Sequence, residues 1–160
     1  MRKIVILLAS VTVLVAGCGG SSNTSSGGSS TPVKLSGSTT NKGSKDLTGT
    51  EISLTQEDFA YNPTFIKGGT PGATITVHLK NVGNNPHTFT STALGADKTL
   101  SPGESADVQV TLPQSGASEF HCKFHQSSNG MQGAFFFKDG DAVAGGAPAS
   151  SSSSSSYDYN

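Results

Sequence analysis

Cysteine is scarce in this sequence, since Cys18 and Cys122 are the only two among 160 residues. Cys18 follows an apolar run near the N-terminus, whereas Cys122 lies in the part of the chain that we expect to fold. If Cys18 is used elsewhere, no intramolecular disulfide is available to Cys122. The retention of this single thiol therefore needs another explanation.

The sequence before Cys18 has the features of a targeting segment. Two basic residues precede an apolar run at residues 4–16, which is shorter than the roughly 20 residues that cross a bilayer as a helix, and this arrangement is typical of a signal peptide. The run ends in Val15-Ala16-Gly17-Cys18, which resembles a bacterial lipobox. The resemblance implies that residues 1–17 are a lipoprotein signal peptide, cleaved before a lipid-modified Cys18. The alternative is an ordinary signal peptide whose cleavage site lies near a cysteine.

Both alternatives place the mature protein outside the cytoplasm. With lipid on Cys18, we expect it to be anchored to the cell membrane, in the periplasm or on the outer cell surface. Disulfides are the usual use of cysteine in such a compartment. The lone thiol of Cys122 is then explained if it binds a metal.

The sequence also lacks a strong excess of either basic or acidic residues. Removal of Arg2 and Lys3 with the signal peptide leaves eight basic and eleven acidic residues, a net charge of −3 with histidine neutral. The basic residues form no stripe of the kind that binds nucleic acid. We therefore expect no nucleic-acid partner.

Two segments have too few apolar residues to form a core. Residues 18–45 are rich in Ser, Gly and Thr and are predicted to be a flexible linker behind the lipidated cysteine. Residues 141–160 run into a serine tract and are predicted to be a disordered tail. The remaining residues, 46–140, are enough for one small domain.

The apolar residues of this domain alternate, and no amphipathic helix is evident. Ile75, Val77 and Leu79 fall on one face of residues 73–80, and residues 105–112 alternate in the same way. This period is typical of half-buried antiparallel strands. Further strands are predicted at residues 51–55, 64–66, 87–91, 118–122 and 131–138, which together indicate an all-β sandwich or barrel.

Three consecutive phenylalanines fall in the last predicted strand. We expect Phe135 and Phe137 to fill the core and Phe136 to face the other way. If exposed, Phe136 would help to form a contact surface.

The residues with the clearest chemistry lie in the stretch 120–133. Cys122 is followed by His125 after two residues and by Met131 after five more, and His87 lies upstream at the start of a predicted strand. One thiolate, two imidazoles and one weak thioether form the ligand set of a blue-copper centre. Thiolate suits Cu(I), and imidazole binds both oxidation states.

This pattern resembles the plastocyanin/azurin family of cupredoxins, whose members share a distant His and a C-terminal Cys…His…Met loop. The similarity covers residues 61–138, including Asn62-Pro-Thr-Phe-Ile and residues 72–77 ahead of the first ligand. It implies an antiparallel Greek-key β-sandwich. The resemblance assigns one type 1 copper ion to four ligands, His87, Cys122, His125 and Met131.

The chain departs from the family pattern at Thr88. The residue after the first ligand is often Asn in this family, where it braces the ligand loop. We expect that bond to be absent here or to be remade by a hydroxyl or backbone group. The loop from His125 to Met131 is also one residue longer than in plastocyanin, which bears on the axial distance and the reduction potential.

The other histidines are interpreted as non-ligands. Strand alternation points His121 away from the face of Cys122, and His78 lies on the polar face of its strand. Cys122 and His125 could instead form a thiol nucleophile and its base, but no orienting Asn or Asp has a recognisable spacing.

The four ligands leave little room for catalysis, because catalytic metal sites keep a position open for water or substrate. The predicted function is therefore one-electron transfer between extracytoplasmic redox proteins, a donor and an acceptor, by a monomeric domain that is not an enzyme. The resemblance nominates His125 as the electron's exit, with Phe124 and Pro86 in an apolar patch around it. The alternatives are a module for copper delivery or buffering, and one domain of a copper oxidase or nitrite reductase.

Overall fold

The computed structural model describes residues 31–143, in which the chain forms ten short strands and one helical turn. The predicted signal peptide, Cys18, the first part of the predicted linker and residues 144–160 lie outside the described residues. The elements in chain order are β1 (Ser44–Leu47), β2 (Glu51–Glu57), β3 (Ala60–Asn62), β4 (Phe65–Gly68), β5 (Thr74–Asn81), β6 (His87–Ser91), β7 (Ala96–Leu100), β8 (Ser105–Thr111), β9 (Ala117–His121), α1 (Gln126–Asn129) and β10 (Gln132–Phe136).

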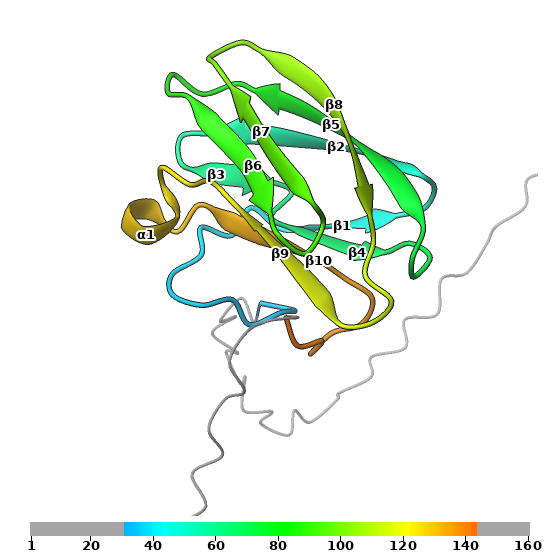
Figure 1. The fold of residues 1–160 in the computed structure, drawn as a ribbon. Coiled ribbons are helices and arrows are strands. Elements are labelled where there is room, and N and C mark those ends of the chain that lie inside the picture. Colours follow the sequence, from blue (N-terminus) through cyan, green and yellow to red (C-terminus); the bar gives the residue numbers. More distant parts are fainter. Residues whose placement is uncertain (1–30, 144–160) are drawn as a thin grey trace, which may run out of the picture. The chain divides into compact units, whose positions relative to one another are not determined.

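The strands form two sheets that pack face to face, as Figure 1 shows. One sheet has the order β1-β4-β10-β9-β6-β7, and the other has the order β3-β2-β5-β8. The predicted all-β sandwich is therefore confirmed. Two strands that supply or flank metal-ligand candidates, β6 and β9, are neighbours in the larger sheet.

The sheets are mixed, whereas the sequence predicted antiparallel pairing. β4 pairs in parallel with both β1 and β10, and β2 pairs in parallel with β5. In each parallel pair the chain leaves one sheet and visits the other before it returns. A strand that is reached by such a crossover is free to run parallel to its neighbour, as a strand reached by a tight hairpin is not.

The core lies between the sheets and follows the predicted alternation. Ile75, Val77 and Leu79 on β5 are buried, and the alternate residues of β8 pack against them. Cys122 and Met131 belong to the same apolar cluster. The metal-ligand candidates are thus continuous with the core that holds the sheets together.

The three phenylalanines are all at least partly buried. Phe135 lies in the main core and Phe137 packs against it, as predicted. Phe136 does face the other way, but it is covered, because it packs with Val33 and Phe65 in a second small cluster. The contact surface that an exposed Phe136 would have formed does not exist.

The described part of the predicted linker is not free of the domain. Val33 is 1% exposed, and β1 begins at Ser44. The side chain of Gln132 donates to the carbonyl oxygens of Ser36 and Ser38 at 2.7 Å. Figure 1 shows this segment in blue, running beneath β10. We call residues 31–40 the N-terminal strap. Although this segment is mostly polar, buried apolar side chains and hydrogen bonds to its backbone hold it against the domain.

The domain also continues slightly past the predicted boundary at residue 140. The carboxylate of Asp141 accepts hydrogen bonds from the backbone N–H groups of Phe137 and Lys138. The N–H of Ala117 donates to the carbonyl of Ala142 at 2.9 Å. These bonds close the end of β10.

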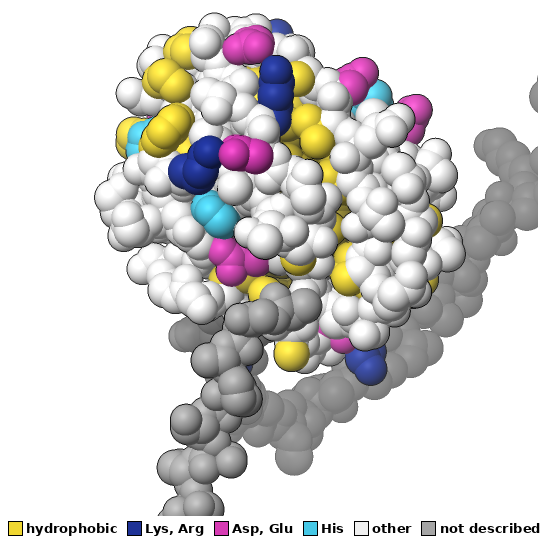
Figure 2. All heavy atoms as spheres, in the orientation of Figure 1, with side chains coloured by type: hydrophobic (Ala, Val, Ile, Leu, Met, Phe, Trp, Pro, Cys, Tyr) yellow, Lys and Arg dark blue, Asp and Glu magenta, His cyan; other side chains and the backbone are white. Residues whose placement is uncertain are grey.

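On the face shown in Figure 2, acidic and basic side chains are interspersed. Among the described residues, several charged side chains form pairs, such as Lys123 with Asp97 at 2.8 Å and Lys67 with Asp139 at 2.9 Å. Within residues 31–143, no helix is both long and apolar enough to cross a membrane.

Candidate metal centre

Four metal-ligand candidates lie at one end of the sandwich. His87 is the first residue of β6, and Cys122 directly follows β9. His125 precedes the short helix α1, and Met131 directly precedes β10. Since β10 pairs with β9 and β6 lies on the other side of β9, the sheet itself brings these strand ends together.

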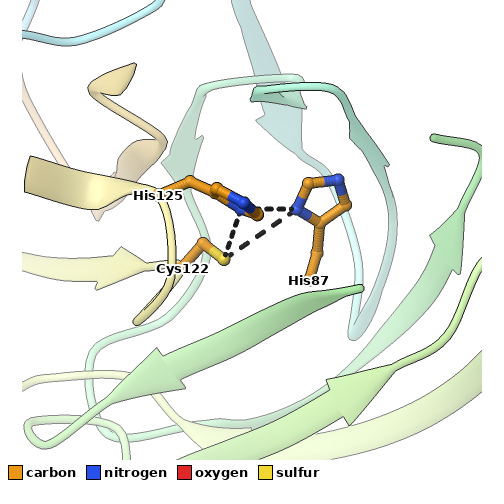
Figure 3. A group of neighbouring side chains, drawn as sticks. All are labelled: His87, Cys122 and His125. Carbon is orange, nitrogen blue, oxygen red and sulfur yellow. Dashed lines mark hydrogen bonds between the residues drawn. The ribbon is translucent and has the colours of Figure 1, made fainter. Parts of the chain in front are cut away.

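Three donor atoms converge, as Figure 3 shows. The Nδ1 atoms of His87 and His125 are 3.2 Å apart. The Cys122 sulfur lies 3.9 Å from Nδ1 of His87 and 3.4 Å from Nδ1 of His125. A triangle of these dimensions has its centre about 2 Å from each corner, which is close to the length of metal–nitrogen and metal–sulfur bonds in proteins. The three side chains therefore fit a metal ion.

The fourth candidate, Met131, is fully buried in the core cluster that contains Cys122. The Cys122 N–H donates to the Met131 carbonyl at 3.0 Å, so the two residues are held side by side. His87 and Cys122 are also fully buried, whereas His125 is partly exposed. The result is a His-Cys-His-Met cluster with one edge near solvent.

The ligand loop, residues 122–131, is fixed by its own backbone. The carbonyl of Cys122 accepts hydrogen bonds from the N–H groups of His125 and Gln126, at 3.2 Å and 2.9 Å. The N–H of Met131 donates to the carbonyl of His125 at 3.3 Å. Gly130 ends the helical turn in the left-handed conformation, with φ of 66°, which glycine adopts at little cost.

Thr88 binds this loop at the thiol and at the residue that follows it. Its N–H donates to the Cys122 sulfur at 3.4 Å, and its hydroxyl oxygen accepts the N–H of Lys123 at 2.9 Å. The bracing bond that the family usually takes from Asn is therefore remade by a hydroxyl, one of the two outcomes that the sequence left open. Thr90 donates in turn to the Thr88 hydroxyl at 3.0 Å.

The structure places two further residues at the site that the sequence did not predict there. Asp58 and Phe59 occupy the turn between β2 and β3, and Asp58 Oδ1 lies 2.8 Å from Nε2 of His87. The Phe59 ring packs against the ring of His125, with 4.5 Å between centroids. An acidic–aromatic pair in a turn is a weak signal, since nothing in the sequence places this turn beside the ligand loop.

Electrostatics at the site favour a charged Asp58 and a neutral His125. The backbone N–H of Asn84, with a further contribution from His87, holds the pKa of the Asp58 carboxyl well below its usual range. Burial lowers the pKa of His125, and the neighbouring His87 lowers it further. A neutral imidazole has a free lone pair, which is the form that binds a metal.

The remaining histidines lie outside the donor group. His121 Nδ1 is 3.4 Å from Oε1 of Glu119, and His78 Nδ1 is 2.7 Å from Oδ1 of Asp107. Within the described residues, the cluster of possible metal-binding side chains contains neither of them.

A comparison with known protein families matches residues 33–135 to the cupredoxin-like domain. A comparison with curated proteins finds no match. Among solved structures, auracyanin from the photosynthetic bacterium Roseiflexus castenholzii is 21% identical, with a TM-score of 0.49 over 60% of this chain and 98% of that one. Auracyanin A from Chloroflexus aurantiacus, described as a "blue" copper protein, is 15% identical, with a TM-score of 0.46 over 59% of this chain and 100% of that one.

A blue copper oxidase from Nitrosomonas europaea is 20% identical, with a TM-score of 0.47. Here the match covers 55% of this chain and 38% of the oxidase. The family match, by contrast, spans most of the described residues and includes the three converging donors. This chain belongs to the cupredoxin-like domain family, and its His-Cys-His-Met arrangement is typical of a single type 1 copper site.

Proposed function

We propose that this protein carries single electrons, with one copper ion held by His87, Cys122, His125 and Met131. The observation that supports the proposal most strongly is the convergence of two imidazole nitrogens and one thiol sulfur at a buried point. When bound, copper supplies a one-electron Cu(I)/Cu(II) couple, for which thiolate and imidazole are suitable ligands. The protein itself must meet the other requirements for electron transfer.

The first requirement is rigidity, because side chains that move during electron transfer slow it. The donors are held by the sheet and by backbone hydrogen bonds within the ligand loop. Thr88 fixes the loop from the neighbouring strand. Donors that are positioned beforehand need little reorganisation when the charge changes.

The second requirement is an exit for the electron. His125 is the one ligand candidate that is partly exposed, and Phe124 beside it is 54% exposed. The ring centroids of Phe124 and His125 are 6.1 Å apart. We propose that His125 is the exit and that Phe124 belongs to the surface that meets redox partners. A small apolar contact of this kind suits brief encounters.

The ligand set also argues against an enzyme. Four protein ligands would fill the coordination of the ion, whereas a catalytic metal keeps a position open. Oxidases of this fold exist, as the Nitrosomonas protein illustrates. We propose that this chain is a carrier and not an oxidase.

The proposed location follows from the sequence. Lipid on Cys18 would anchor the mature protein outside the cytoplasm, in the periplasm or on the cell surface. The stretch between Cys18 and the N-terminal strap would serve as the tether. The domain would work as a monomer and would exchange electrons with a donor and an acceptor near the membrane.

Voltammetry of the copper-loaded full chain, with a Cu(I) chelator present, tests this function. We expect a reversible one-electron wave and copper that stays bound in both oxidation states. An irreversible wave, with copper lost to the chelator on reduction, would contradict electron transfer and support copper delivery or buffering. A Cys122→Ser variant, which should give no such wave, is the control.

A further inference from the structure

Asp58 is outside the group of converging donors but makes a direct contact with one of them, His87. Its Oδ1 lies 2.8 Å from Nε2 of His87, and its side chain is only 20% exposed. The opposite nitrogen of the same ring, Nδ1, is the one that faces Cys122 and His125. One side of the imidazole therefore meets the carboxylate and the other meets the proposed metal.

The carboxylate is held in place by the turn that precedes β6. The N–H of Asn84 donates to Asp58 Oδ2 at 2.7 Å, and the N–H of Asn85 donates to Oδ1 at 3.3 Å. The side chain of Asn81 shapes this turn, because it accepts the Gly83 N–H at 2.9 Å and donates to the Asn85 carbonyl at 2.8 Å. Both oxygens of the Asp58 carboxylate thus accept hydrogen bonds from backbone N–H groups, and Oδ1 lies where it can accept another from Nε2 of His87.

Gly83 allows the turn to come this close. A Cβ atom at this position would lie 2.8 Å from Cγ of Asp58 and 3.1 Å from Nε2 of His87. Any other residue would push the turn away from the carboxylate–imidazole pair. The contact is therefore a feature of three segments that fit together, the β2–β3 turn, the Asn81–Asn85 turn and the start of β6.

We propose that Asp58 is the positioning residue of the copper centre, which fixes the proton of His87 on Nε2 and places a permanent negative charge one imidazole ring away from the ion. This inference rests on the proposed function, since it assigns His87 Nδ1 to copper. A carboxylate at this position orients the ring and strengthens the imidazole as a donor. Negative charge stabilises Cu(II) more than Cu(I), so Asp58 lowers the reduction potential.

The test compares Asp58→Asn with Asp139→Asn in the copper-loaded full chain. Asparagine keeps one oxygen that can accept from Nε2, but it removes the charge and the oxygen that accepts the Asn84 N–H. Asp139 supplies the same change of net charge at an exposed position paired with Lys67. We expect D58N to keep the visible spectrum. The variant should favour Cu(I) over Cu(II) about tenfold more than the wild type does, which corresponds to a reduction potential higher by about 59 mV. We expect D139N to leave the potential unchanged. A D58N potential equal to that of D139N would overturn the proposal.

The position of the proton is tested separately, in the metal-free wild-type protein. The ¹H–¹⁵N spectrum of the imidazoles should show a slowly exchanging proton on Nε2 of His87. A proton on Nδ1 in its place would overturn the proposal, and this result does not depend on whether the variants fold. A wild type without a blue copper spectrum would defeat the proposed function, whereas a blue wild type with an unshifted D58N potential would defeat only the role of Asp58.

Discussion

The backbone N–H of Thr88 donates a hydrogen bond to the sulfur of Cys122, over 3.4 Å. The hydroxyl of the same residue accepts the N–H of Lys123 at 2.9 Å. One residue of β6 thus binds the ligand loop at two adjacent residues, Cys122 through its backbone and Lys123 through its side chain. The two bonds can be separated by mutation.

Thr88→Val keeps the shape and the backbone N–H of residue 88 but removes the hydroxyl. The N–H of Lys123 then loses its partner, and we expect the free energy of unfolding to fall by about 1–3 kcal/mol. The blue spectrum should remain, because the bond to sulfur is retained. Urea unfolding measures the loss, with the exposed Thr74→Val on β5 as a control that should change stability by less than about 0.5 kcal/mol. Equal stability of the two variants would show that the hydroxyl does not brace the loop.

Met131→Gln tests the axial ligand. An amide oxygen is a harder donor than a thioether and favours Cu(II), so we expect a lower reduction potential. Met131→Leu, which has a similar volume, should cost less than about 1.5 kcal/mol of stability and should raise the potential, because it offers no donor. If voltammetry finds the same potential in all three proteins, Met131 only packs in the core.

Gln132→Leu tests the N-terminal strap. The change removes the donors to the carbonyls of Ser36 and Ser38. We expect stability to fall by about 1–3 kcal/mol and protease to cut within residues 31–40 more quickly. The exposed Gln109→Leu on β8 is the matched control. Identical cleavage patterns, identified by mass spectrometry, would mean that the strap is held by other contacts.

The pKa of His78 is expected to lie above the ordinary histidine value. The hydrogen bond that the His78 ring donates to the Asp107 carboxylate raises the pKa of His78, and Glu51 contributes less. The folded state therefore favours the imidazolium, and this contribution to stability is complete below the ordinary histidine pKa of about 6.5. It is lost as the pH rises through the folded pKa.

An NMR titration of the His78 ring measures this shift. Asp107→Asn should return the pKa toward its ordinary value. A His78 pKa that is the same in wild type and D107N would rule out Asp107 as the cause.

The local features of the site could be predicted from the sequence. Cys122, His125 and Met131 fall within ten residues, so their spacing alone suggests a shared ligand loop. The alternation of β5 likewise predicts a strand and its buried face. The donor convergence with His87 depended on the family resemblance, because nothing local connects residue 87 to residue 122.

The features that were missed depend on tertiary contacts. Asp58 reaches His87 only because two turns meet at one end of the sandwich. The N-terminal strap has the composition of a linker, yet Val33 fits a cluster on the outer side of β10. The strand at β7 has polar residues between Ala96 and Leu100 and shows no clear alternation. Each of these features depends on contacts between segments that are distant in the sequence, so local sequence patterns do not predict it.

The visible spectrum of the Cu(II)-loaded protein tests the central claim most directly. Ligation by the Cys122 thiolate predicts an intense blue or green charge-transfer band. The band should disappear in Cys122→Ser and persist in His121→Ala, which alters the adjacent residue outside the donor group. A colourless wild type that binds copper only weakly, or a band that survives in Cys122→Ser, would contradict the type 1 site.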